Sequence, residues 1–168
     1  ISDMRTDMQL WDRLVYHVVE HMMERYGRSQ VLKWKFCVWN SPDNPRINYS
    51  ALQRENYYRL YLSTWKVIKA IDERFQVGTS ALMSVNLLYP EWMDSFASFY
   101  QKQHCEPDFV MMNLYTVDDT PQSIQRHQSA GIMQHRDAVY NVIRRILNNN
   151  EDCGWQVRAW YVAEWNFD

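Results

Sequence analysis

Residues 34–40, WKFCVWN, are the clearest indication of the fold class. This stretch is short, apolar and aromatic, and Ser41 and Pro42 close it. A run of this kind is typical of a buried strand in a parallel sheet. Three later segments have the same character, so the sequence predicts four strands in all, at residues 34–40, 75–78 (FQVG), 108–113 (DFVMMN) and 157–166 (VRAWYVAEWN).

Amphipathic segments separate these strands. Apolar residues recur at helical spacing in four of them, and Gly27 marks the end of the first. The predicted helices span residues 8–26, 54–73, 90–104 and 135–149, and polar loops are predicted at 41–50 and 115–134. Helices that alternate with strands predict an α/β fold with a parallel sheet. A doubly wound sheet and a (β/α)8 barrel both fit this pattern, which does not choose between them.

Length and charge limit the classes of function. The 168 residues suffice for one domain, residues 1–168, with a core of its own. The net charge is −2 and no basic patch could hold a phosphate backbone, so we expect no nucleic acid as a partner of this segment. No apolar run approaches the roughly 20 residues of a membrane helix, and the first residues lack a signal-peptide pattern, so we expect no membrane partner. Since the chain does not start with Met, we expect it to be a piece of a longer one.

We expect no cofactor and no metal. His17, Glu20 and His21 spell H-x-x-E-H, a pattern that some zinc proteases carry on a helix. No convincing third ligand follows, so two partly exposed helix histidines are the simpler interpretation. Three widely spaced cysteines argue against a disulfide framework and favour a reduced, cytoplasmic location. Cys37, inside an apolar strand, is predicted to be a buried small hydrophobic residue.

Polar side chains follow each predicted strand, with tryptophans beside two of them. In parallel α/β folds, chemistry gathers at the carboxyl ends of the strands. Amide and carboxylate groups suit sugar hydroxyls, and aromatic rings suit the apolar faces of a sugar. Each asparagine could instead cap a turn, but polar residues follow all four predicted strands. The sequence therefore predicts a sugar site, with candidates Trp39, Asn40, Ser41, Asp43, Thr79, Ser80, Asn113, Tyr115, Glu164, Trp165 and Asn166.

Several segments together resemble glycoside hydrolase family 39, the β-xylosidase and α-iduronidase family. KWKFCVWNSPD resembles the fourth strand of that family, which usually ends in Trp-Asn-Glu-Pro. PDFVMMNLY resembles a segment that usually continues from Asp-Phe-Val to His-x-Tyr, and AEWN resembles the Thr-Glu-Trp-Asn of the seventh strand. HMMERYGRSQVLKWKF and YRLYLSTWKVIKAIDERFQVG match in the same order along the chain. The resemblance implies part of a (β/α)8 barrel, with about four parallel strands equivalent to strands 4–7.

The resemblance assigns roles to single residues. Glu164 takes the position of the nucleophile, Asn40 that of the asparagine that contacts the sugar 2-hydroxyl, and Tyr115 that of the tyrosine near the nucleophile. Trp39 and Trp165 are the neighbouring aromatic candidates for substrate binding. Two positions depart from the family pattern. Ser41 stands where the general acid/base glutamate is usual, and Asn113 stands where a histidine is usual.

These departures affect the expected function. Retaining hydrolysis needs two carboxyl groups, and a serine hydroxyl titrates too high to act as the acid. Asp43 lies two residues further on, which displaces its carboxyl too far for a good replacement. We therefore expect a non-catalytic domain that binds a sugar or short oligosaccharide. Such domains resemble the sensor parts of AraC-type, sugar-responsive transcriptional regulators.

Two other functions stay open at this point. One is an active β-xylosidase-like hydrolase with a replacement acid, and the other is a structural association module with a vestigial pocket. A slice of four strands leaves two open parallel edges, and bare edges pair with other chains. The sequence therefore predicts either a homo-oligomer formed through these edges or a piece cut from a larger barrel.

Overall fold

In the computed structural model, residues 8–43, 51–83, 91–115 and 159–166 are described. The helices are α1 (Met8–Tyr26), α2 (Arg28–Val31), α3 (Ala51–Ile71) and α5 (Glu91–Gln103). The strands are β1 (Lys35–Cys37), β2 (Gln76–Gly78), β3 (Ala81–Met83), β4 (Val110–Tyr115) and β5 (Trp160–Asn166). The helix predicted at 135–149 and the loop at 116–134 lie outside the described residues.

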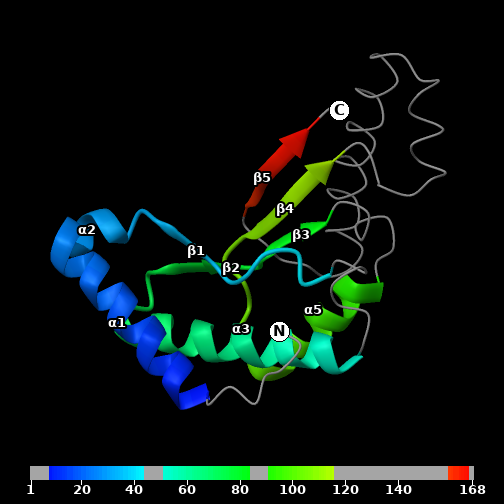
Figure 1. The fold of residues 1–168 in the computed structure, drawn as a ribbon, viewed down its shortest axis with the longest axis horizontal. Coiled ribbons are helices and arrows are strands. Elements are labelled where there is room, and N and C mark those ends of the chain that lie inside the picture. Colours follow the sequence, from blue (N-terminus) through cyan, green and yellow to red (C-terminus); the bar gives the residue numbers. More distant parts are fainter. Residues whose placement is uncertain (1–7, 44–50, 84–90, 116–158, 167–168) are drawn as a thin grey trace.

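All the described strands run parallel. β1 pairs with β2, and β3, β4 and β5 pair in that order, with their arrowheads pointing the same way in Figure 1. An isolated parallel bridge between Asn40 and Ala81 links the end of the first strand segment to β3. Each strand segment therefore lies beside the next one in the sequence. This sequential order is that of a barrel segment, because the order of a doubly wound sheet reverses at its switch point.

The second predicted strand is longer than expected. It continues beyond Gly78, after a break at Thr79 and Ser80, into β3. At the break, side chains replace strand pairing: Met111 N donates to Thr79 Oγ1 at 3.1 Å, and Ser80 N donates to the Tyr57 hydroxyl at 3.0 Å. Both break residues are fully buried. Thr79 and Ser80 thus follow the end of β2, as the sequence predicts, but the sequence does not predict β3, which begins directly after them.

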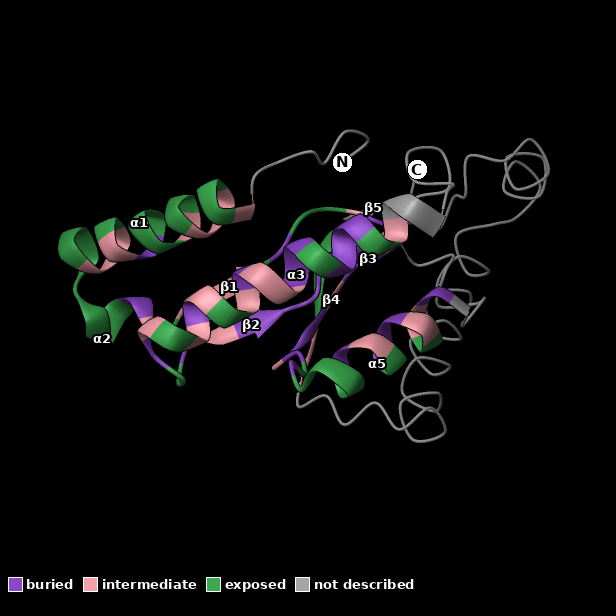
Figure 2. Cartoon of the chain, turned by 90° about the horizontal axis from the view of Figure 1, so that it is seen from below, coloured by how far each residue is buried: buried purple, intermediate pink, exposed green. Residues whose placement is uncertain are grey.

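The described helices cover one face of the sheet. Figure 1 shows α1, α3 and α5 on the same side of the strands, and Figure 2 shows α3 between the other two. The core is filled mainly by aromatic rings from α3 and α5. The sheet contributes Val77, Leu82 and Val110 to it. Tyr57 and Phe96 lie at its centre, with ring centroids 5.6 Å apart. Burial of these large rings is the main apolar contribution to stability in this part of the chain.

Helix α1 has a buried face and an exposed apolar stripe. Its buried face packs against the core, and Trp11 Nε1 donates to Thr64 Oγ1 of α3 at 2.9 Å. Gly27 ends the helix with a φ of 80°, a left-handed conformation that glycine adopts without strain. The stripe consists of Leu10, Leu14 and Val18, whose exposed fractions are 55%, 55% and 42%. Figure 2 shows α1 as the most exposed of the long helices.

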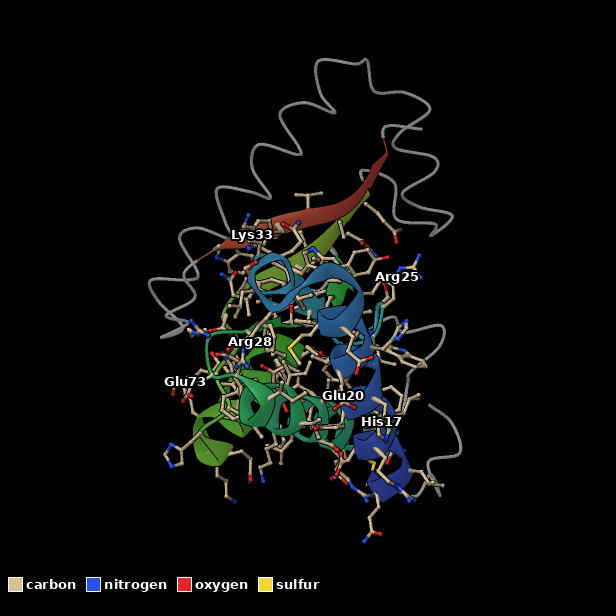
Figure 3. The ribbon with its side chains drawn as sticks, turned by 90° about the vertical axis from the view of Figure 1, so that its left-hand side faces the viewer. His17, Glu20, Arg25, Arg28, Lys33 and Glu73 are labelled. Atoms are coloured by element: carbon tan, nitrogen blue, oxygen red, sulfur yellow. The ribbon has the colours of Figure 1, made fainter. Side chains whose placement is uncertain are left out.

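Ion pairs tie the helices together at the amino ends of the strands. The buried Asp72 carboxylate accepts from Arg28 at 2.5 Å and from Arg74 at 2.8 Å. Hydrogen bonds from these two guanidinium groups, Arg74 first, hold the pKa of Asp72 well below its usual value. Lys69 Nζ pairs with the Asp108 carboxylate at 2.7 Å, which also accepts from Val77 N. Figure 3 labels Arg28 and Glu73 at this end of the molecule.

The other face of the sheet carries Lys35, Phe109 and Tyr161. Lys35 Nζ lies 5.0 Å from the centroid of the Tyr161 ring and bonds to Gln76 Oε1 at 2.8 Å. The Phe109 ring leaves no room for a side chain at Gly78, since a Cβ there would lie 2.2 Å from Phe109 Cε2. The side chains of Lys35, Phe109 and Tyr161 thus form a packed layer on this face, on the amino-end side of the carboxyl ends of the strands. The same face carries the candidate site.

Cys37 differs from its prediction. It is exposed and not a buried hydrophobic residue, and its thiol donates to Thr79 O at 2.8 Å. Although the residue as a whole is exposed, burial of the sulfur atom raises the pKa of the thiol to about 11, against a smaller lowering by a hydrogen bond with the Ala81 backbone.

None of the described helices combines the length and the apolarity that a membrane-spanning helix needs.

Candidate functional site at the carboxyl ends of the strands

Three of the predicted site residues form one hydrogen-bonded cluster. Asn113 Nδ2 donates to Asn40 Oδ1 at 3.1 Å and to Ser41 Oγ at 3.2 Å. Ser41 Oγ also donates to Asn40 Oδ1, at 3.4 Å. Asn40 and Ser41 follow β1 and Asn113 lies in β4, 72 or more residues later in the chain. We name these three residues the amide cluster.

The backbone around Asn40 is strained. Trp39 has a φ of 72° and Ser41 a φ of 44°, both in the left-handed region that non-glycine residues rarely adopt. Ser41 N donates to Ala81 O at 2.9 Å, which ties the turn to β3. Residues held in such conformations cost about 1–3 kcal/mol each and concentrate at functional sites. The turn also leaves the Trp39 side chain 48% exposed, next to the cluster.

Asn113 is the buried member of the amide cluster. Only 2% of its surface is exposed, whereas Asn40 is exposed and Ser41 is half-buried. Its Oδ1 atom is buried and has no hydrogen-bond partner among the described residues. A buried acceptor without a partner is unusual, since most buried polar atoms are hydrogen-bonded.

Glu164 lies beside the amide cluster on the neighbouring strand. It pairs with Asn113 across the β4–β5 ladder, where a β-bulge makes Val162 the partner of Met112 and leaves Ala163 as an extra residue. Paired residues on adjacent strands project to the same face of a sheet. The bulge therefore brings Glu164, and not Ala163, to the face that Asn113 occupies. The Glu164 side chain is exposed.

Tyr115 and Trp165 lie at the ends of their strands. Tyr115 is the last residue of β4 and pairs with Asn166, and Trp165 pairs with Leu114. The backbone thus places both positions one or two residues beyond the level of Asn113 and Glu164, at the carboxyl edge of the sheet.

Asp43 lies apart from the exposed side of the cluster. It is 5% exposed and contributes, after the larger effect of burial, to a raised pKa of the Tyr57 hydroxyl in the helix-covered core. A carboxyl group in this position cannot readily exchange protons with a ligand at Ser41 and Asn40. The structure thus gives Asp43 a buried position and gives Thr79 and Ser80 a place inside the sheet.

Sequence reasoning missed two features of the site. It treated Ser41 and Asn113 as separate departures from a pattern, but the two side chains touch. It also missed Tyr57, whose hydroxyl supports the strand at Ser80 from the helix side. No signal in the sequence indicates either contact, since each depends on strand register and helix placement.

Metal ligands do not gather in the described part of the chain. No group of three or more His, Cys, Asp or Glu residues there could hold a metal ion. His17 Nδ1 instead lies 3.2 Å from Glu20 Oε2 on the exposed side of α1, as Figure 3 shows for the two labelled residues.

The fold and the site together define a class. Sequential parallel strands, helices on one face and polar side chains at the carboxyl ends are features of part of a (β/α)8-barrel domain. The profile described as glycosyl hydrolases family 39 matches residues 2–167. The chain belongs to this family, which acts on carbohydrates.

Two curated relatives are β-xylosidases. The chain is 33% identical to a β-xylosidase of Geobacillus stearothermophilus over 111 residues, which is 66% of this chain and 21% of that protein. It is 25% identical to a β-xylosidase of Caldicellulosiruptor saccharolyticus over 156 residues, 93% of this chain and 30% of that protein. The matched regions thus span between a fifth and a third of the length of these relatives.

Solved structures show the same fold. The chain matches a monomeric β-xylosidase from Caulobacter crescentus CB15 with a TM-score of 0.69 and 24% identity, over 96% of this chain and 32% of that one. It matches the GH39 enzyme from Xanthomonas axonopodis pv. citri with a TM-score of 0.72 and 24% identity, over 96% of this chain and 31% of that one. The described α/β arrangement is therefore part of the barrel seen in family 39 structures.

Proposed function

We propose that the chain is a non-catalytic carbohydrate-binding domain derived from a family 39 glycoside hydrolase. The observation that carries this proposal is the amide cluster, in which the Ser41 hydroxyl occupies the end of the first strand segment and is held by Asn113. Asn40 and Glu164 offer exposed polar groups, after the first strand segment and in β5, on either side of Asn113, and Trp39 offers an exposed aromatic face. These are the groups that bind sugar hydroxyls and sugar faces.

The proposed absence of turnover follows from the chemistry at Ser41. A retaining glycosidase needs a second carboxyl group about 5–5.5 Å from its nucleophile to protonate the leaving oxygen. A serine hydroxyl does not release a proton at neutral pH, and Asp43 is buried. The loss of general acid/base assistance lowers a rate by about 10²–10⁴-fold.

The experiment is thermal melting against a panel of monosaccharides and short xylo-oligosaccharides, with mass detection of any hydrolysis. A ligand that binds only the folded state raises the melting midpoint by mass action. We expect a shift with at least one pentose or hexose ligand and no cleavage. The absence of a shift with every sugar would contradict the proposal and favour a structural association module.

Variants locate the binding site. We expect Glu164→Ala and Asn40→Ala to weaken sugar binding without lowering the melting midpoint of the free protein by more than a few degrees, since both side chains are exposed. The matched control is Glu73→Ala, an exposed glutamate in the turn between α3 and the amino end of β2 (labelled in Figure 3). Equal affinity in all three variants would refute this placement of the site.

Glu164 favours a second candidate function, an active β-xylosidase-like hydrolase. An exposed carboxylate at a strand end, paired with Asn113, could attack a substrate whose leaving group needs no protonation. This candidate predicts release of nitrophenol from an aryl β-xyloside and loss of that release in Glu164→Gln. The first candidate predicts release by neither protein.

The biological setting that we propose is a sugar-responsive, AraC-type transcriptional regulator in the cytoplasm, with this chain as its sensor. The departure of Ser41 from the family 39 pattern motivates this setting, since a domain that binds a sugar without cleaving it is suited to sensing. Sugar-dependent reporter expression that requires this chain tests it, and expression that does not depend on sugar would contradict it.

A further inference from the structure

We propose that Asn113 is a positioning residue that fixes the side-chain amide of Asn40 with its N–H donors toward solvent. The site would then recognise a hydrogen-bond acceptor of the ligand at this position. The orientation of the amide is a property of the free protein. The statement about the ligand rests on the proposed sugar-binding function.

Hydrogen bonds to one atom carry the proposal. Asn40 Oδ1 accepts from Asn113 Nδ2 at 3.1 Å and from Ser41 Oγ at 3.4 Å. A carbonyl oxygen has two lone pairs, so these two donors occupy the acceptor capacity of the Asn40 side chain. The group of Asn40 that remains for a ligand is Nδ2, with two N–H donors. Asn40 is exposed, so a ligand can reach this group.

The reverse arrangement, with both amides turned over, is less favourable. It would place the Asn113 nitrogen at the position now held by Oδ1, which is buried and has no described partner. Two N–H donors would then be buried without acceptors, in place of a single carbonyl oxygen. Each unsatisfied buried group is destabilising, so the burial of Asn113 selects the arrangement in which Asn40 presents its donors.

Ser41 supports the same orientation. Its oxygen accepts from Asn113 Nδ2 at 3.2 Å, and its hydrogen points to Asn40 Oδ1. The hydroxyl therefore has no hydrogen left for a ligand. A sugar hydroxyl in contact with Asn40 has to accept a hydrogen bond there and give its own hydrogen to another acceptor.

The test measures hydrogen exchange of side-chain amides by NMR on the labelled full chain, without sugar. The amide groups of Asn40 and Asn113 are assigned through the carbons of their own residues. We expect the Asn113 amide to exchange at least about tenfold more slowly than the Asn40 amide, since only the former is buried and hydrogen-bonded. Slower exchange at Asn40 than at Asn113, or equal exchange, would overturn the proposal, and this arm needs no variant.

A variant supplies the second readout. In Asn113→Asp at pH 8, an acceptor replaces the donor, so the Asn40 amide should turn over and its exchange should slow by about tenfold. Asn113→Ala is the control, because it removes the donor without offering an acceptor and should leave the Asn40 amide fast. Unchanged exchange at Asn40 in Asn113→Asp would overturn the proposal. Titration of xylose into the same samples tests the proposed function separately, because a failure to bind refutes sugar binding and leaves the exchange result to decide the orientation.

Discussion

In the proposed function, Ser41 is the residue that decides whether the end of the first strand segment can take part in hydrolysis. Its hydroxyl joins Asn40 and Asn113 in a neutral network, whereas hydrolysis needs a group that gives up and takes back a proton. The exposed carboxylate of Glu164 lies on β5, which pairs with the strand of Asn113. In our proposal, therefore, the side chain at position 41 decides whether the site only binds a sugar or also hydrolyses it.

Ser41→Glu tests this separation. A glutamate here supplies the missing carboxyl, so hydrolysis of xylobiose should rise by about 10²–10⁴-fold over the unmodified chain. Mass detection of xylose measures it. The control is Ser41→Gln, which has the same shape without the proton. Equal hydrolysis by both variants would show that the acid is not the missing element.

Asp72 gives a second prediction at the residue scale, which concerns stability and pH. Its two arginine partners lower its pKa in the folded state, so this carboxylate stabilises the fold at pH values above its unfolded pKa of about 4. That stabilisation is lost as the pH falls through the folded pKa. Asp72→Asn should therefore lower the urea midpoint at pH 7, and the gap to the unmodified chain should narrow between pH 4 and pH 2.

The control for this prediction is Asp94→Asn, at an exposed position on α5. Its urea midpoint should follow that of the unmodified chain at both pH values. A gap for Asp72→Asn that stays constant from pH 7 to pH 2 would contradict the role of the ion pairs.

Much of the candidate site is predictable from residue types at strand ends. Asn40, Asn113 and Glu164 are found in this way, because parallel strands bring their carboxyl ends to one edge. The contact between Ser41 and Asn113 is not predictable, since it depends on the register across three strand segments. The left-handed backbone of Trp39 is not predictable either, since isolated tryptophan disfavours it.

The break between β2 and β3 is the main feature at the scale of elements. A helix residue, Tyr57, replaces a strand partner by accepting from Ser80 N in a buried setting. The sheet can therefore bend between β2 and β3 without leaving this N–H group unsatisfied. Helix α3 thus supports the sheet through a hydrogen bond as well as through apolar packing.

Tyr57→Phe tests this support. Removal of the hydroxyl leaves Ser80 N buried without an acceptor, so the free energy of unfolding should fall by about 1–3 kcal/mol. Tyr58→Phe is the matched control, because its hydroxyl bonds to Ser95 Oγ in a part-buried position, and the loss should be about 1 kcal/mol or less. Urea denaturation measures both. Equal losses in the free energy of unfolding would contradict a larger contribution from the hydrogen bond between Ser80 N and the Tyr57 hydroxyl.

The sequence predicts most described elements, with both ends of α1 correct and the ends of α3 and α5 displaced by one to three residues. Helical spacing predicted 8–26, 54–73 and 90–104, and the structure has α1, α3 and α5 at Met8–Tyr26, Ala51–Ile71 and Glu91–Gln103. The sequence does not predict β3, because Thr79 and Ser80 before it are polar. The burial of these two residues depends on partners from elsewhere in the chain. The short helix α2 was missed as well, because four residues carry too little periodicity.

At the scale of the whole molecule, the described strands leave two open sheet edges. Within the described residues, β1 pairs on one side with β2, and β5 pairs on one side with β4. The stripe of Leu10, Leu14 and Val18 on α1 is exposed. The relatives of known structure extend over about three times the matched length, since the chain covers 31–32% of them. Exposed strand edges and apolar stripes favour association.

Association of this 168-residue chain is therefore the expected outcome in isolation. Light scattering should give a mass above the 20.4 kDa of one copy. Leu14→Lys should raise the dissociation constant by about tenfold, or about 1.4 kcal/mol, with little effect on stability at an exposed position. Glu24→Lys, an exposed change on the same helix, is the control. A strictly monomeric chain would contradict this prediction.

The sequence pattern left two architectures open at this scale. Alternation of helices and strands reports that strands are parallel but not which strands are neighbours. The observed pairing of each strand segment with the next supplies that missing information. Long-range neighbours are set by packing of the entire sheet, which no single segment encodes.

The bulge at Ala163 has a consequence for how this strand tolerates changes in length. Side chains alternate along a regular strand, so a single deletion normally inverts the phase of every residue that follows. Here Ala163 is already out of phase, and its removal would leave Val162 opposite Met112 and Glu164 opposite Asn113. The alternation of side chains before the bulge is thus independent of the alternation after it. A chain without Ala163 could still place the Glu164 carboxylate on the same face of the sheet.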